Sequence, residues 1–327
     1  MSENSERIVY WNGKLIAERD AKLSIYDSAL MFGDMVFEMT RSFNKEQFML
    51  REHIERLFAS AKFISIDIPM SVDQVVAACE QTIAANEPNF ANDDEHRLMI
   101  NITRGLLSIY ADRVDAEPGC NIIISDFPLR WTVASMAPLF DLGINAVIPA
   151  QRTIPAQLLE PKVKNRSRLH YMMANIQTSR MNGERNWALL LDPDGFIAEG
   201  TGSNFFIVKQ GCLITPEPRN ILRGISRKYT MELAEHIGIG TCIERNIEPF
   251  DVMEADEAFM TATPFCILPV TSLHGTPIGN GKMGAITRRL LDQWGENVGV
   301  DIEAQIKSYA DTPGASSGPS PYQFKKS

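Results

Sequence analysis

Residues 196–204 read Phe-Ile-Ala-Glu-Gly-Thr-Gly-Ser-Asn, a stretch in which two glycines follow an apolar start. Its apolar start and its two glycines predict a strand that ends in a tight turn. It lacks the third glycine and the following helix of a dinucleotide-binding fingerprint, so the signal for such a site is weak. Alone, the stretch predicts a tight connection between two strands, with Glu199 either a solvated loop residue or a functional carboxylate.

Hairpins and helices surround this stretch in the C-terminal half. The run Trp187–Leu191 turns at Asp192–Gly195, and the run Asn204–Val208 turns at Lys209–Gly211, which is typical of β-hairpins. The other elements predicted for this half are the strands Ile144–Pro149 and Glu257–Thr261 and the helices Leu169–Met181, Ile225–Ile237 and Ala285–Trp294.

The N-terminal half predicts a small sheet with two helices. Apolar residues recur at helical spacing over Ile54–Ile64, and a second helix, Ser71–Ala85, begins with a capping-box pattern. The strand His96–Thr103 has one apolar row and one mostly polar row that could line a cleft, the latter formed by Arg97, Met99, Asn101 and Thr103. The other predicted strands are Gln47–Leu50, Asn121–Ser125 and the hairpin Ile8–Ile16, which turns at Trp11–Gly13.

These elements predict an α+β protein, because strands and helices come in separate runs rather than in a doubly wound alternation. We expect a smaller N-terminal domain over 1–127, a connection over 128–143 that contains two prolines and no clean periodicity, and a larger domain over 144–310. The remaining residues, 311–327, are rich in Ser, Gly and Pro and are expected to be disordered.

Composition restricts the class of ligand. The chain has 327 residues, 44% of them hydrophobic, and its net charge of -9 argues against nucleic acid or an anionic membrane as a partner. Five dispersed cysteines form no pair with metal-ligand spacing, so neither a metal site nor a disulfide framework is expected. The polar start, MSENSERIVYW, does not resemble a secretory signal, which predicts a cytoplasmic protein that binds small molecules.

Three further segments share the order and spacing of one known family with 196–204. They are His-Ile-Glu-Arg-Leu at 53–57, Pro-Lys-Val-Lys-Asn at 161–165 and Leu-Arg-Gly-Ile-Ser-Arg at 222–227. Together the four segments resemble the class IV aminotransferases, pyridoxal-phosphate enzymes of fold type IV. That family includes branched-chain, D-amino-acid and (R)-selective amine transaminases, and also aminodeoxychorismate lyases.

The resemblance extends to about Trp294 and implies a two-domain enzyme that binds pyridoxal phosphate in the cleft between its domains. It implies ping-pong transamination, in which an amino group passes from an amino acid or an amine to a 2-keto acid. It also implies a homodimer whose sites take a loop from the partner. The alternatives are a pyridoxal-phosphate lyase resembling aminodeoxychorismate lyase and a non-catalytic protein that binds the cofactor.

Lys164 stands at the family's lysine position, so the resemblance implies that it forms the internal aldimine and carries the catalytic proton. Without the resemblance it would be interpreted as a surface lysine, and Lys162 is the nearest competitor. Glu199 matches the glutamate that keeps the cofactor's ring nitrogen protonated.

The cofactor's phosphate is assigned to three segments. Arg56 matches the family's phosphate arginine, although an ion pair with Glu52 or Glu55 is the ordinary alternative. Gly224 to Ser226 open a helix whose free N–H groups suit an anion, although Ser226 alone would be a plain N-cap. Thr263 matches the third phosphate-side segment, and the other cofactor contacts that the resemblance implies are Ser203, Asn204, Leu222 and Ile225.

The substrate pocket resembles that of the branched-chain group in part. The candidate residues are Phe32, Phe37, Arg41, Arg97, Thr263 and Pro264. The branched-chain group usually has tyrosine where this chain has Phe32 and Leu169. Two backbone N–H groups at the Thr263 and Pro264 positions usually face the substrate carboxylate there, and proline has none to give. We therefore expect weaker discrimination for an α-carboxylate, with some D-amino acids or simple (R)-amines accepted.

Overall fold

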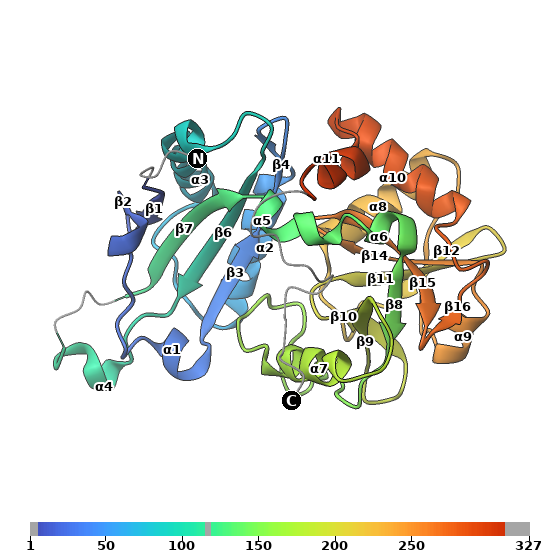
Figure 1. Cartoon of the computed structure of the whole chain (residues 1–327). Helices are drawn as coiled ribbons and strands as arrows, with labels where there is room; N and C mark the ends of the chain where they lie inside the picture. Colours follow the sequence, from blue (N-terminus) through green and yellow to red (C-terminus); the bar gives the residue numbers. More distant parts are fainter. Residues whose placement is uncertain (1–5, 115–118, 311–327) are drawn as a thin grey trace. The chain divides into compact units, whose positions relative to one another are not determined.

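The computed structural model describes residues 6–114 and 119–310, which form two compact units (Figure 1). Unit 1 contains the described residues up to Leu129 together with Val163–Arg168, and unit 2 contains Arg130–Lys162 and the residues from Leu169 onward. The grouping of Val163–Arg168 with unit 1 was not expected from the sequence, and the predicted domain boundaries stay a prediction. The prediction for 311–327 lies outside the described residues.

Unit 1 is built on a five-stranded antiparallel sheet in the order β2-β1-β7-β6-β3. Its strands are β1 (Ile8–Trp11), β2 (Lys14–Ala17), β3 (Met35–Met39), β6 (His96–Thr103) and β7 (Asn121–Pro128). Helices α2 (Leu50–Phe63) and α3 (Val72–Asn86) cover one face (Figure 1). The predicted apolar row of β6 lies in this core, where Leu98, Ile100 and Ile102 are fully buried.

Local sequence signals account for most of unit 1. Asn12 and Gly13 turn the first hairpin at φ values of 45° and 91°, and Ser71 forms a capping box with Gln74 at the start of α3, as predicted. The short elements of this unit are η1 (Glu18–Asp20), α1 (Ser28–Phe32), β4 (Ser42–Phe43), β5 (Glu46–Gln47), η2 (Glu87–Asn89) and α4 (Ser108–Ala111).

The predicted strand Gln47–Leu50 is wrong. Asn44 and Lys45 adopt positive φ values of 51° and 68°, so the chain reverses after Phe43 and the β4–β5 hairpin is only two residues long on each side. Met49 is also left-handed, with φ 51°, and Leu50 already begins α2. Two tight changes of direction therefore replace the strand.

Unit 2 contains a nine-stranded mixed sheet, six strands of which close on themselves. The ring is β10-β9-β8-β15-β14-β11, and the pairing of β10 with β11 closes it. Its strands are β8 (Ile144–Val147), β9 (Asn186–Leu191), β10 (Ile197–Gly200), β11 (Asn204–Lys209), β14 (Glu257–Ala262) and β15 (Cys266–Leu273). The strands β12 (Cys212–Pro216), β13 (Ile243–Arg245) and β16 (Thr276–Pro277) extend it.

Among its described residues, unit 2 also contains seven α-helices and one 3-10 helix. They are α5 (Arg130–Val133), η3 (Ala134–Met136), α6 (Leu139–Leu142), α7 (Leu169–Ser179), α8 (Ile225–His236), α9 (Pro249–Met253), α10 (Ala285–Val298) and α11 (Ile302–Ser308). The first three lie where the sequence indicated no regular structure. The stacked rings of Phe206 and Phe259, with centroids 4.9 Å apart, join β11 to β14 inside the core. No helix among the described residues is long and apolar enough to cross a membrane.

Candidate active site

The corner between β10 and β11 positions Glu199. Glu199 and Asn204 are the one residue pair that joins these two strands, and the Gly200 N–H donates to the Ser203 carbonyl at 2.8 Å. A Cβ on Gly200 would lie 2.4 Å from the Ser203 hydroxyl oxygen, so a larger residue would require the Ser203 side chain to move. The turn therefore fixes the backbone of Glu199 and of Asn204 on either side of it.

Three neutral groups donate hydrogen bonds to the buried carboxylate of Glu199, which is 4% exposed. The Tyr171 hydroxyl donates to Oε1 at 2.5 Å. The Leu222 N–H and the Asn204 side-chain amide donate to Oε2 at 3.1 and 3.3 Å. Hydrogen bonds to a carboxylate favour its ionised form, so these three donors suit a carboxylate that acts as an anion at the closure of the ring of strands.

The start of α8 lies beside the same asparagine. Gly224 is the N-cap, and a Cβ at this position would lie 2.1 Å from Oδ1 of Asn204. Ile225 and Ser226 are buried in the first turn of the helix, where backbone N–H groups have no partner within the helix. This end of α8 therefore has the chemistry of an anion site.

Thr263 and Pro264 follow β14, whose residue Thr261 faces Asn204 across the strand pair. The Thr261 hydroxyl is buried and has no hydrogen-bond partner among the described residues. A buried hydroxyl without a partner is costly, so this side of unit 2 offers a donor for a ligand. The anionic carboxylate, the helix start and this hydroxyl together fit a phosphorylated heteroaromatic cofactor with a basic ring nitrogen.

Lys164 belongs to unit 1 and lies along the edge strand β3. Its carbonyl accepts from the Phe37 N–H at 2.9 Å, its N–H donates to the Ser60 hydroxyl at 3.2 Å, and Val36 bridges to Asn165. The Lys164 amine lies 5.0 Å from the centre of the Phe37 ring. The side chain is therefore half-buried on an ordered edge, and it does not have the setting of an ordinary surface lysine.

Two arginines share the face of Lys164. The guanidinium carbons of Arg166 and Arg168 lie 3.6 and 5.0 Å from the centre of the same Phe37 ring, and Arg166 donates to the side-chain oxygen Oδ1 of Asn101 at 3.0 Å. The spacing of two residues places these side chains on one side of an extended segment. Asn101 lies in the predicted polar row of β6, so this row belongs to the surroundings of Lys164.

Arg56 forms an ion pair, but with neither of the partners considered from the sequence. Its Nε and Nη2 donate to the two carboxylate oxygens of Glu38 at 2.6 and 2.8 Å, and His53 Nδ1 lies 2.7 Å from the same carboxylate. Burial would raise the pKa of Glu38, but the charges and hydrogen bonds of Arg56 and His53 outweigh it and lower the pKa well below its ordinary range. The pKa of His53 is lowered, first by burial and then also by Arg56 and Lys164.

The other candidate substrate residues divide into buried and exposed ones. Arg41 is 1% exposed and Arg97 is 8% exposed, and burial together with the charge of Arg41 lowers the pKa of Arg97 to about 10. Phe37 is also buried, whereas Phe32 is 64% exposed on α1. Leu169, at the start of α7, is 72% exposed.

Each unit thus gathers its own part of the predicted site. In unit 2 these residues are Glu199, Ser203, Asn204, Leu222, Gly224, Ile225, Ser226, Thr263 and Pro264, and in unit 1 they are Lys164, Arg56, Phe32, Phe37, Arg41 and Arg97. The competitor, Lys162, belongs to unit 2, where its amine pairs with Glu160 at 2.8 Å. The sequence alone gave no role to Glu38 or to Tyr171. Tyr171 precedes Asn175 by four residues on α7, which is the spacing that places two side chains on one helix face.

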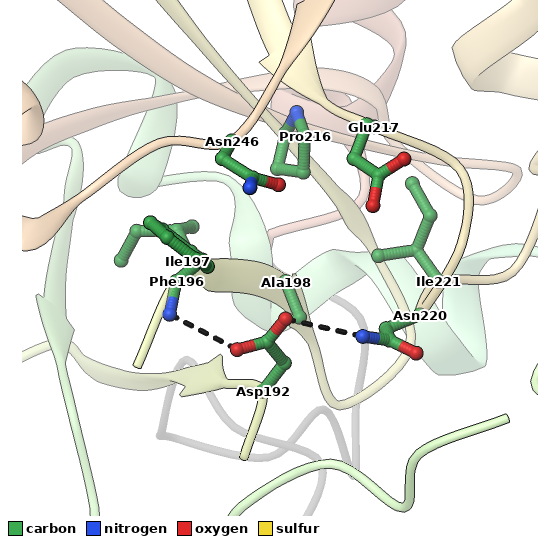
Figure 2. A pocket seen from close by; sticks show the side chains of 9 residues that line it. All are labelled: Asp192, Phe196, Ile197, Ala198, Pro216, Glu217, Asn220, Ile221 and Asn246. Atoms are coloured by element: carbon green, nitrogen blue, oxygen red, sulfur yellow. Dashed lines mark hydrogen bonds between the residues drawn. The ribbon is translucent and has the colours of Figure 1, made fainter. Parts of the chain in front are cut away.

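A pocket in unit 2 is lined in part by β10, the strand that carries Glu199. Figure 2 shows Asp192 reaching across it to Asn220, whose side-chain amide donates at 3.1 Å, while the Phe196 N–H donates to the other oxygen at 3.0 Å. Ala198 and Ile221 also line the pocket and adjoin Glu199 and Leu222 in the sequence. The hydrogen bond between Asn220 and Asp192 therefore ties the segment just before Leu222 to the turn between β9 and β10.

Comparison with known proteins identifies the class. The family model of class IV aminotransferases matches residues 35–273, and the chain belongs to this family. A Methanocaldococcus jannaschii protein with the provisional name of a branched-chain-amino-acid aminotransferase is 36% identical over 289 residues, which are 88% of this chain and 94% of that protein.

Solved structures agree with this assignment. The branched-chain amino acid aminotransferase of Escherichia coli matches with a TM-score of 0.79 and 28% identity, over 89% of this chain and 94% of that one. The Thermobaculum terrenum enzyme in its PLP form matches with a TM-score of 0.77 and 26% identity, over 94% of this chain and 97% of that one. The predictions of an α+β fold of type IV, of pyridoxal phosphate as cofactor and of transamination are confirmed. The lyase alternative is not favoured.

Proposed function

We propose that Lys164 and Glu199 act on one pyridoxal phosphate. When bound, the cofactor supplies an aldehyde that takes up the amino group and a ring that accepts an electron pair. Lys164 would hold the cofactor through its amine, and the amine, once the amino donor has displaced it, would move the proton between the substrate α-carbon and C4′ of the cofactor. Glu199 accepts a hydrogen bond from the ring nitrogen and keeps it protonated. The observation that supports this role is the buried carboxylate with its three neutral donors.

The phosphate is proposed to bind Ser226, the N–H groups at the start of α8 and Thr263, with Arg56 as the cationic contact. Gly224 supports this assignment, because its lack of a Cβ lets the helix start approach Asn204 closely. Ser203, Asn204 and Leu222 would act on the ring side. Asn204 and Leu222 are already hydrogen-bonded to Glu199 and to each other.

The proposed donors are branched-chain and other apolar amino acids, since the named relatives are branched-chain enzymes. Phe32 and Phe37 would form the apolar wall, with Arg41 and Arg97 as the cations nearest to a substrate carboxylate. Pro264 supports a second class of donor. It cannot donate a backbone hydrogen bond, so the carboxylate loses one of two expected donors, and simple (R)-amines and some D-amino acids should be accepted as well.

A donor series tests this specificity. We expect leucine, valine, D-alanine and (R)-1-phenylethylamine all to react with a common keto-acid acceptor, with leucine or valine fastest. The Pro264→Gly variant, which restores the N–H, should raise kcat/KM for leucine relative to the amine. High and exclusive efficiency on the branched L-amino acids in the wild type would contradict the role given to Pro264.

We further propose a homodimer in the cytoplasm. Apolar side chains on and beside α1 and α4 are exposed on unit 1, namely Ile25, Leu30, Met31, Phe32 and Ile109. Several large exposed apolar side chains on two short helices favour a subunit contact. The five cysteines are free thiols, which favours a reducing compartment. Sedimentation of the holoenzyme at several concentrations tests the dimer, and a monomer throughout would contradict it.

A further inference from the structure

One face of α7 is attached to the corner that carries Glu199. The Tyr171 hydroxyl donates to Glu199 at 2.5 Å, and four residues later Asn175 accepts from the Thr201 hydroxyl at 3.0 Å. The helix thus contacts both the carboxylate and the turn that follows it. Sequence resemblance assigns no role to either residue of α7.

The Tyr171 ring is held in place independently of its hydroxyl. It packs against the buried side chains of Ala174, Ala188 and Leu190, and its centre lies 4.2 Å from that of the His170 ring. Phenylalanine would keep these contacts and remove only the oxygen. The hydroxyl can therefore be tested without disturbing the packing of the helix.

The hydroxyl contributes to the charge and the orientation of the carboxylate. Oε2 of Glu199 receives the Asn204 and Leu222 donors, and Tyr171 donates to Oε1. Donors on both oxygens fix the plane of the carboxylate, since rotation about its last bond would break at least one of them. A short O–H···O bond to a carboxylate also stabilises the ionised form more than a neutral hydrogen bond does.

We propose that Tyr171 is a positioning residue that holds Glu199 ionised and oriented toward the cofactor's ring nitrogen. This inference rests on the proposed role of Glu199. Loss of the hydroxyl leaves the buried carboxylate with one donor fewer and lets it rotate. The ring nitrogen then loses part of its protonation, and the cofactor is held less tightly.

Tyr171→Phe tests the proposal, with Tyr229→Phe as the matched control. Tyr229 lies in the same unit, and its hydroxyl accepts from Asn297 at 2.9 Å. We expect Tyr171→Phe to slow the amino-donor half-reaction about tenfold to a hundredfold, the range for one hydrogen bond to a charged group. The dissociation constant of pyridoxal phosphate should rise about threefold or more, because the loss of the same hydrogen bond weakens cofactor binding less than it slows the reaction. The pH at which the bound cofactor's visible absorbance changes should shift.

A double-mutant cycle separates this role from a structural one. In the Glu199→Gln background, Tyr171→Phe should cause less than about a threefold further loss, because the two side chains act together. The absorbance titration is recorded per bound cofactor, so it does not depend on the fraction of folded protein. If Tyr171→Phe matches Tyr229→Phe in rate, affinity and titration while Glu199→Gln is impaired, the inference is overturned. If Glu199→Gln itself keeps wild-type turnover, the proposed function fails at Glu199.

Discussion

Two buried glutamates, Glu38 in unit 1 and Glu199 in unit 2, hold negative charge in different ways. Glu38 is fully buried and is paired with the Arg56 guanidinium and the His53 ring. Glu199 is 4% exposed and accepts from a phenol, a backbone N–H and an amide. The donors of Glu38 include the Arg56 cation, whereas the phenol, backbone N–H and amide that donate to Glu199 are neutral groups.

Under the proposed function, Glu38 is a structural carboxylate and Glu199 is a functional one. A buried ion pair is hard to break, because removal of one partner leaves an uncompensated charge in the interior. A carboxylate held by neutral donors keeps its electrostatic effect on a cation that binds later, such as a protonated pyridine ring. Substitutions near Glu38 should therefore act mainly on stability, and substitutions at Glu199 mainly on the chemical step.

The largest effect on stability is expected from Arg56→Met. The free energy of unfolding should fall by about 3–5 kcal/mol, since Glu38 then keeps a buried charge without its guanidinium. Retention of pyridoxal phosphate should also weaken, and added cofactor should restore it in part. Urea unfolding of the protein with and without cofactor measures both effects.

The double variant Arg56→Met/Glu38→Gln provides the control, because it removes the buried charge as well. It should recover a large part of the stability lost in Arg56→Met. A single variant as stable as the wild type would show that Arg56 does not support Glu38. Unchanged retention of the cofactor would remove Arg56 from the phosphate site.

Glu199→Gln should show the opposite pattern. Turnover should fall about 10²- to 10³-fold, the usual size for the loss of one charge-stabilising contact. The melting temperature should stay within about 4 °C of wild type, because the glutamine oxygen can accept from Asn204 and Leu222 while its NH2 group donates to the Tyr171 hydroxyl oxygen. Glu232→Gln, at an exposed pair with Lys228 on α8, is the matched control. A large loss of stability with unimpaired turnover would assign Glu199 to the structural class.

The smallest effect is the pH dependence of stability. Burial lowers the pKa of His53. Below about pH 6.5 the unfolded chain therefore binds a proton at His53 that the folded chain does not bind. The contribution of neutral His53 to the free energy of unfolding is present above that pH and is lost on acidification. His53→Asn, which keeps a donor for Glu38, should flatten the decline in unfolding free energy between pH 7.5 and 5, by at most about 1.4 kcal/mol per pH unit.

Asp126 gives a control of opposite sign. Burial raises its pKa to about 6, so the folded chain holds a proton that the unfolded chain releases, and this contribution is lost as the pH rises through about 6. Asp126→Asn should therefore steepen the decline on acidification. Equal slopes in the wild type, His53→Asn and Asp126→Asn would contradict both assignments.

Local sequence patterns predicted most of the fold. They failed where contacts between residues far apart in the sequence determine the structure. The helices α2 and α3 and the strand β6 follow from periodicity and capping alone. The strand β15 was missed because it contains Pro269, which is unusual in a strand paired on both sides. The place of Val163–Arg168 beside β3 depends on contacts across more than a hundred residues, such as that of Lys164 with Ser60.

For the candidate site too, local motifs could be predicted from the sequence, whereas contacts between residues on different elements could not. The turn after Glu199 and the glycine before α8 are visible as motifs, and the structure gives both a geometric reason. The partner of Arg56 was sought at Glu52 and Glu55 on its own helix, but the ion pair joins it to β3, eighteen residues away. Tyr171 was missed because a tyrosine in an amphipathic helix has the pattern of a packing residue.

Reduction of the holoenzyme with borohydride, followed by peptide mapping, tests the central claim most directly. Borohydride permanently attaches pyridoxal phosphate to the lysine that holds it. In the proposed function, that lysine is Lys164. We predict one labelled peptide, with the label on Lys164, and no label in Lys164→Ala, which should also lack turnover. A label on Lys162, or on any other lysine of the wild-type enzyme, would contradict the account.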